Sequence, residues 1–237
     1  MIAGLSKAVT LYLTPLLALT AVILSIITFL APTLILHDQV ALLSVIPSTV
    51  LVQQNAPSTP IDGPSVFMGA LGSCSRPNND ASFNCTATLI SPTFDFTVLP
   101  NNAPHLLLSP PNAFAPVFII ISLIFSALFF ITFTAISFRH KMGKASRFLD
   151  SPRLQKISAW IGVFGFVIGL TSFFILRIWF GKAVEDFNAT IISQGAQGPK
   201  LLARVGNAFT MVWVAYAFYA VPIVISLTKL NVTVTKA

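Results

Sequence analysis

Residues 113–138 read AFAPVFIIISLIFSALFFITFTAISF, a run without a single acidic or basic side chain. A helix needs roughly 20 predominantly apolar residues to cross about 30 Å of hydrocarbon, and this run is long enough. Comparable runs extend over about 9–36, 157–180 and 207–228. The sequence therefore predicts an all-α membrane four-helix bundle.

The composition supports a membrane protein. The chain is 55% hydrophobic and 9% charged, with a mean hydropathy of +0.83, whereas a soluble globular domain carries roughly 25% charged residues. The first run is nearly twice as long as the apolar core of a signal peptide, which has about 7–15 residues. We therefore expect a retained first span and a single integral unit over residues 1–237.

The positive charge is concentrated in one segment between the second and third runs. Residues 139–156 contain six basic residues and only one acid, a net charge of +5, whereas residues 37–112 carry four aspartates and one arginine, a net charge of −3. An excess of Lys and Arg in short loops marks the cytoplasmic side of a membrane. We expect residues 139–156 and both termini in the cytosol, residues 37–112 and 181–206 outside the cell, and no nucleic-acid partner.

The same basic segment is a candidate contact for anionic lipid head groups, because each juxtamembrane cation contributes about 1 kcal/mol near such a surface. The alternative is that these charges only set the orientation of the protein. The six side chains are Arg139, Lys141, Lys144, Arg147, Arg153 and Lys156.

The long outer segment has the pattern of a small antiparallel β-sheet. Apolar or alternating stretches are separated by turn-rich sequences such as Arg76-Pro77-Asn78-Asn79-Asp80. We predict strands at Ala41–Ile46, Val66–Ser73, Ser82–Leu89 and Phe94–Leu99.

The two cysteines of the chain, Cys74 and Cys85, lie in this outer segment. An oxidising compartment favours a disulfide between them, which would join two antiparallel strands. Closing so short a loop contributes on the order of 2–3 kcal/mol to stability in the chain-entropy model. A reactive thiol pair or a metal site would need closer cysteine spacing or further ligands.

The first cysteine ends the sequence Gly69-Ala70-Leu71-Gly72-Ser73-Cys74. This pattern, with a second cysteine soon after it, resembles the signature of claudin-like tetraspans. It is most similar to the fungal branch, with its cortical-patch (eisosome) tetraspans, PalI-type pH-response regulators and mating-induced calcium-uptake tetraspans. In physical terms, glycines at 69 and 72 let a strand bend or let another backbone come close.

The resemblance implies a plasma-membrane scaffold or regulator of a cortical membrane domain, or of cell-surface signalling, in a fungus. Its partners would be other membrane or wall proteins. The alternative implied by the same resemblance is an accessory of calcium influx during mating or stress, and a small transporter or channel comes third. Animal claudins carry a tryptophan in this motif, and the outer segment 37–112 has none, which disfavours a paracellular barrier.

The third run contains three glycines, Gly162, Gly165 and Gly169. The last two form a G-x-x-x-G pair, which lets two helix backbones approach closely in a bilayer. Packing inside one bundle and homo-oligomerisation through this face both remain open. In the fourth run, Tyr216 and Tyr219 are expected to pack inside the bundle.

Beyond Leu176 the pattern becomes amphipathic, with Phe180, Val184, Phe187 and Ile191 at helical spacing. We therefore expect the third helix to continue several turns past the apolar run. The stretch 194–199 is expected to form the turn into the fourth helix, and a kink is expected at Pro222.

Two sequons, at Asn84 and Asn188, are candidate glycosylation sites in segments expected to be external. His37 and His105 flank the outer segment and would titrate near pH 6–7 as reporters of acidity, although isolated interfacial histidines usually have no such role. The apolar cores of the four runs contain no Asp, Glu, Lys, Arg or His, and the chain contains no metal-binding, nucleophile-elbow or phosphate-loop motif. We predict a non-enzymatic protein without catalytic residues, metal or cofactor.

Overall fold

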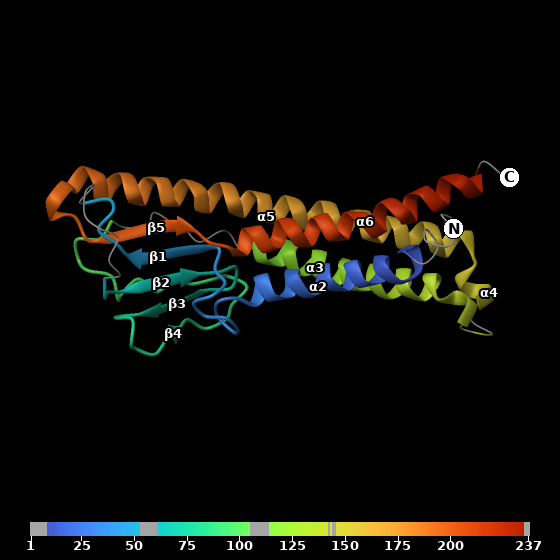
Figure 1. The fold of residues 1–237 in the computed structure, drawn as a ribbon, viewed down its shortest axis with the longest axis horizontal. Coiled ribbons are helices and arrows are strands. Elements are labelled where there is room, and N and C mark those ends of the chain that lie inside the picture. Colours follow the sequence, from blue (N-terminus) through green and yellow to red (C-terminus); the bar gives the residue numbers. More distant parts are fainter. Residues whose placement is uncertain (1–8, 53–60, 105–113, 142, 144–145, 235–237) are drawn as a thin grey trace. The chain divides into compact units, whose positions relative to one another are not determined.

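The computed structural model describes residues 9–52, 61–104, 114–141, 143 and 146–234. The chain divides into two compact units, which can be followed along the ribbon in Figure 1. The helical unit comprises residues 1–26, 118–172 and 211–237, and the sheet unit comprises residues 27–117 and 173–210.

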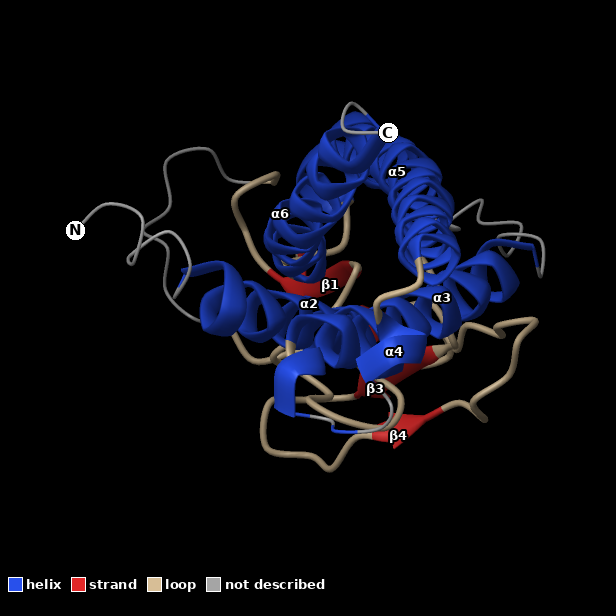
Figure 2. Ribbon diagram, turned by 90° about the vertical axis from the view of Figure 1, so that its right-hand side faces the viewer, coloured by secondary structure: helices blue, strands red, loops and turns tan. Residues whose placement is uncertain are grey.

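Four long helices dominate the chain, and Figure 2 views them almost end-on. Each is long and apolar enough to cross a membrane, which is typical of a multi-pass membrane protein. A short π-helical segment, η1 (Val9–Leu13), precedes the first. The four are α2 (Thr14–Leu30), α3 (Phe114–Ser137), α5 (Pro152–Gln194) and α6 (Ala208–Val234).

The first helix ends earlier than the apolar run does. We predicted a span to about residue 36, but α2 ends at Leu30. Pro32 follows closely and has no backbone N–H to continue the helix. The fourth helix runs past the predicted residue 228 to Val234 and contains Pro222, which cannot donate a hydrogen bond to the carbonyl of Phe218.

Within the helical unit, the three glycines of α5 lie against α3 and α6. A Cβ at Gly162 would come within 2.7 Å of the Phe129 ring, and one at Gly165 within 3.1 Å of the Phe125 Cβ. A Cβ at Gly169 would collide with the hydroxyls of Tyr216 and Ser122. These contacts place the glycine face inside the bundle, where small residues allow close helix packing.

Buried hydroxyls connect the same helices. Ser122 of α3 donates a hydrogen bond of 2.7 Å to the Gly165 carbonyl of α5. Because the Ser122 proton is used there, Tyr216 of α6 is the donor in its 3.2 Å bond to Ser122. A second bond of 2.7 Å joins Thr132 and Ser158. Interhelical hydrogen bonds of this kind contribute about 0.6–2 kcal/mol each in membrane bundles.

The sheet unit contains a five-stranded antiparallel sheet in the order β4-β3-β2-β1-β5. Figure 1 shows β5, from the C-terminal third of the chain, beside β1. The core includes Leu43, Val45, Val66 and Met68, which are fully buried. The strands are β1 (Leu43–Pro47), β2 (Ser65–Met68), β3 (Ser73–Arg76), β4 (Asn84–Cys85) and β5 (Leu201–Val205).

Three of the predicted strands need correction. The stretch Val66–Ser73 is not one strand, because Gly69 N–H donates to the Gly72 carbonyl at 2.9 Å and closes a tight hairpin between β2 and β3. The strand predicted at Ser82–Leu89 shrinks to β4. Residues 94–99 form no strand, and the backbone N–H groups of Asp95 and Thr97 bond instead to the side chains of Ser73 and Asp95.

We predicted a sheet confined to residues 37–112, and this prediction was wrong. Strand β5 comes from residues 181–206 and pairs with β1 over five positions, from Leu43↔Val205 to Pro47↔Leu201. The segment Leu201–Val205 is short and lies directly before a helix, so its sequence gave no period-2 signal strong enough to separate it from a connecting turn.

The continuation of the third helix is confirmed. Helix α5 extends to Gln194, and Phe180, Phe187 and Ile191 on its C-terminal part are at most 2% exposed. Figure 1 shows this part of α5 running alongside β5 and β1. Its amphipathic face therefore belongs to the core of the sheet unit.

The glycine packing predicts an asymmetry between two substitutions in one helix. Gly169→Ala should destabilise the protein by about 1–3 kcal/mol, because a methyl group there overlaps the Tyr216 and Ser122 hydroxyls. Thermal unfolding of the purified protein in detergent measures the effect.

The matched control is Gly181→Ala, where the added methyl meets only the flexible end of Arg177 at 3.0 Å. Removing a helical glycine usually stabilises a helix by about 1 kcal/mol, so this variant should melt at or above the wild-type temperature. Equal melting temperatures for both variants would contradict the packing described here.

Candidate functional site: the cystine-bridged edge of the sheet

Cys74 and Cys85 form a disulfide across β3 and β4. Their Cα atoms are direct partners in the antiparallel register, and Cys74 is fully buried. The turn 76–80 lies between the two strands, so the bridge joins antiparallel neighbours as the sequence predicted. The bond closes the sheet at an edge where β4 contributes only two residues.

The glycines before the cystine have two separate structural roles. A Cβ at Gly69 would collide with the Ala31 carbonyl oxygen, which follows the end of α2. Gly72 has a φ of +153°, and a Cβ there would collide with the Thr86 hydroxyl. Glycine at 69 permits close backbone approach, and glycine at 72 permits a backbone conformation that L side chains rarely adopt.

His37 lies directly against the cystine. Its Nδ1 is 3.6 Å from each of the two sulfur atoms and also contacts the Pro32 carbonyl oxygen. Because a carbonyl can only accept, Nδ1 carries a proton in this arrangement. His105, the other histidine considered as a pH reporter, lies outside the described residues.

An aromatic and a cationic side chain extend this cluster. The Phe83 ring lies 5.9 Å from the His37 ring, and the Arg76 guanidinium lies 5.0 Å from the Phe83 centroid. Arg76 also donates to the Asn79 carbonyl at 3.2 Å, while the Asn79 N–H donates to Asp62 at 2.7 Å. The polar turn and the cystine are thereby connected through one row of side chains.

The His37 nitrogen and the two sulfurs lie within 4.8 Å of one another, a spacing that a metal ion could use. Cysteine binds metals as the thiolate, and here both sulfurs are bonded to each other. With both sulfurs in the disulfide, the cluster offers a metal ion no thiolate.

Asn188, one of the two candidate glycosylation sites, forms hydrogen bonds to β5 at the opposite edge of the sheet. Its side-chain amide donates to the Ala203 carbonyl at 2.9 Å and accepts from the Ala203 N–H at 3.0 Å. The amide thus pairs with β5 as a neighbouring strand would. Asn84, in β4, has an exposed side chain.

Close contacts also join the residues just before α6 to the residues just before β1. A Cβ at Gly206 would collide with the Ala41 carbonyl oxygen, and the Gly206 N–H donates to the Leu42 carbonyl at 2.8 Å. The Asn207 side chain donates to the Gln39 carbonyl at 2.7 Å. Sequence reasoning named Asn188 only as a glycosylation candidate and missed Gly206 and Asn207, because each of the three contacts a partner more than ten residues away.

The basic segment belongs to the helical unit and is partly neutralised. Arg139, in the 3₁₀ turn η2 (Arg139–Lys141), forms an ion pair of 2.8 Å with Asp150. Lys141, Arg153 and Lys156 are exposed. Arg147 belongs to the short helix α4 (Ser146–Leu149), and Lys144 lies outside the described residues. Phe148 in α4 is 69% exposed beside these cations.

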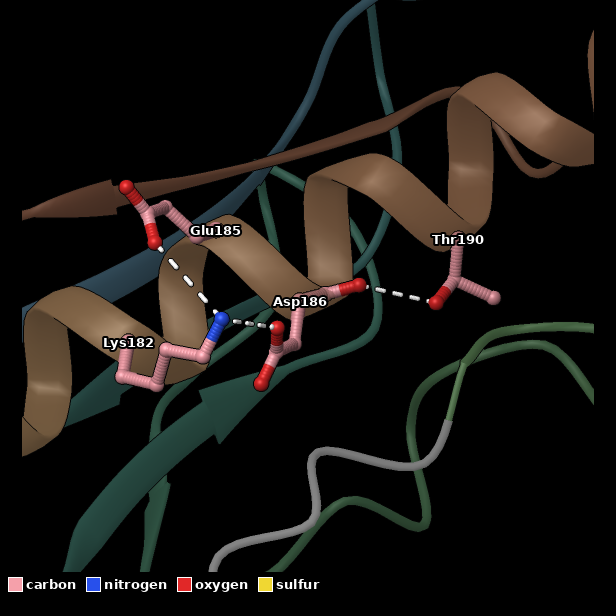
Figure 3. A network of polar contacts seen from close by, with 4 residues as sticks. All are labelled: Lys182, Glu185, Asp186 and Thr190. Atoms are coloured by element: carbon pink, nitrogen blue, oxygen red, sulfur yellow. Dashed lines mark hydrogen bonds and ion pairs between the residues drawn. The ribbon is translucent and has the colours of Figure 1, made fainter.

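Figure 3 shows an exposed polar network on α5 beyond its apolar run. Lys182 pairs with Asp186 at 2.9 Å and with Glu185 at 3.8 Å, and Thr190 donates to the Asp186 carbonyl. The hydrogen bond to Asp186 and its negative charge raise the pKa of Lys182. Such exposed i, i+4 pairs contribute little to stability. Because all three charged side chains are more than half exposed, they identify the exposed side of this part of α5.

The fold and the site define a class: four apolar helices that carry a small, disulfide-bridged antiparallel sheet. No family model and no curated protein matches the chain.

Replacing both cysteines by serine should lower the free energy of unfolding by about 2–3 kcal/mol, because the unfolded chain then loses the constraint of an eleven-residue loop. Thermal unfolding with and without a thiol reductant provides the measurement. Reductant should lower the melting temperature of the wild type and leave that of the double variant unchanged. If full reduction left the wild-type melting temperature unchanged, the disulfide would not stabilise the fold.

Asn188→Ala should destabilise the protein by about 1–3 kcal/mol, because it leaves the Ala203 N–H and carbonyl without their side-chain partner. The same geometry predicts that Asn188 carries no glycan in the folded protein, since its amide nitrogen is turned towards β5.

Thr190→Ala supplies the control, because it destroys the sequon and spares the Asn188 amide. This variant should keep the wild-type melting temperature and electrophoretic mobility. A mobility increase on loss of Thr190, matched by glycosidase treatment of the wild type, would show that Asn188 is modified after all.

Proposed function

We propose that this protein is a non-enzymatic tetraspan of the plasma membrane, claudin-like in organisation, that acts as a scaffold or regulator of a cortical membrane domain or of cell-surface signalling. The sheet unit would face outward and meet other membrane or wall proteins. Residues 139–156 and both termini would lie in the cytosol.

The observation that carries the proposal is the pairing of β1 with β5, which builds one sheet from two segments that are far apart in the sequence. The end of α2 packs against Gly69, and the start of α6 bonds to residues 39–42. A partner bound to this sheet would therefore contact a surface whose chain continues into two apolar helices. That arrangement suits display and regulation.

The surface of the sheet unit offers features that suit a protein partner. Leu89 and Ile90, which follow β4, are 48% and 51% exposed. A hollow of about 260 Å³ is lined by residues between Phe96 and Pro104. Exposed apolar side chains on a protein surface are one feature of protein interaction sites.

The basic segment 139–156 supports the proposed orientation of the protein in the membrane and its proposed contact with anionic lipids. The exposed cations Lys141, Arg153 and Lys156 lie in the segment with a net charge of +5, and an excess of basic residues favours the cytosolic side. Anionic head groups of the inner leaflet would complement them.

A second function, an accessory role in calcium influx, is favoured by one feature. Asp38, Asp62 and Asp80 are all exposed on the sheet unit, and the segment 37–112 is net negative. Such a surface would raise the local concentration of cations.

Imaging of a tagged copy in its host cell, with calcium uptake measured in a deletion strain, tests both functions. Patch residence beside a cortical marker, lost in an Arg153→Gln/Lys156→Gln variant, is expected for the scaffold. Loss of influx with normal patches, restored by the wild type and not by Asp38→Asn/Asp80→Asn, would favour the calcium role instead.

An epitope inserted after Asp80 serves as the orientation control. Antibody should reach it on intact cells and should reach a C-terminal epitope only after permeabilisation. The reverse pattern would refute the proposed topology.

A further inference from the structure

The helical unit contains a small, partly open cavity lined by residues of three helices. Its volume is about 10 Å³, close to the space that one water molecule occupies. Ser25 of α2, Ser126 of α3, and Tyr216 and Tyr219 of α6 contribute hydroxyl groups to its wall. Ala21, Val22 and Ala215 form the rest of the lining.

The Tyr219 hydroxyl is the unusual group in this wall. The side chain is 2% exposed, and its oxygen has no hydrogen-bond partner among the described residues. The ring is fixed by Phe129, edge-on at 5.5 Å, and by Phe166, stacked at 6.3 Å. Because packing holds the ring in place, the hydroxyl oxygen cannot move to a partner elsewhere.

The neighbouring hydroxyls are arranged around the same space. Ser126 lies near Tyr219, yet the two do not meet the geometry of a direct hydrogen bond. Ser25 and Ser126 are 8% and 7% exposed. The Tyr216 hydroxyl donates to Ser122.

We propose that one water molecule is bound in this cavity and bridges Tyr219, Ser126 and Ser25. A buried water needs two to four polar partners, and these three hydroxyls supply them. The water would join α2, through Ser25, to α3 and α6, through Ser126 and Tyr219.

The chemistry of the wall decides between water and other ligands. All the polar groups are neutral hydroxyls, so no carboxylate is present to replace the hydration shell of a cation. The volume excludes an organic molecule. A single water, which both donates and accepts, matches hydroxyls that can do the same.

The test is a pair of substitutions in the purified protein, combined with a structure that resolves ordered waters. If the water is bound, Tyr219→Phe removes one of its partners and should lower the melting temperature by about 2–4 °C. Ser126→Val, which fills the cavity with a methyl group, should lower it as well. Density for one water within hydrogen-bond distance of the Tyr219 oxygen is expected in the wild type.

A dry cavity predicts the opposite results. Tyr219→Phe would then remove a hydroxyl that has no partner, Ser126→Val would fill an empty space, and both variants would melt at or above the wild-type temperature. Absence of density for water, including a structure in which Tyr219 and Ser126 bond directly, would overturn the proposal. Tyr216→Phe is the positive control, because its loss of the Ser122 bond lowers stability in either case.

Discussion

The sheet unit depends on the pairing of β1 with β5, which joins segments separated by more than 150 residues. Without this pairing, β1 would be an edge strand with a row of unpaired backbone groups. Asn188 then satisfies the Ala203 backbone on β5, and the Cys74–Cys85 disulfide closes the opposite edge. Both edges of the sheet are therefore closed by side chains, which explains how a sheet with strands of two to five residues holds together.

Glycine makes the close approaches possible in both units. Gly69 admits the Ala31 carbonyl, Gly206 admits the Ala41 carbonyl, and Gly169 admits the hydroxyls of Tyr216 and Ser122. At each position a methyl group would occupy space already filled by another segment. The G-x-x-x-G face of α5 is thus used for packing within the chain, so an oligomer would have to use a different surface.

The proposed scaffold function follows from how the two ends of the sheet differ. The cystine edge carries the His37, Phe83 and Arg76 cluster and the exposed Leu89 and Ile90. The β5 edge is covered by α5 through Asn188. Among the described residues, the exposed apolar side chains beside the cystine are therefore the surface that we propose for a partner.

The sequence alone determined the four apolar helices, the extension of α5 and the cystine, because each depends on local periodicity, length or the presence of just two cysteines. It also located the glycines at 69 and 72 without showing what approaches them. The fifth strand, the hairpin within residues 66–73, the Asn188 amide pair and the hydroxyl-lined cavity were decided by tertiary structure. Each of these requires two segments far apart in the chain to meet, and no pattern within either segment specifies its partner.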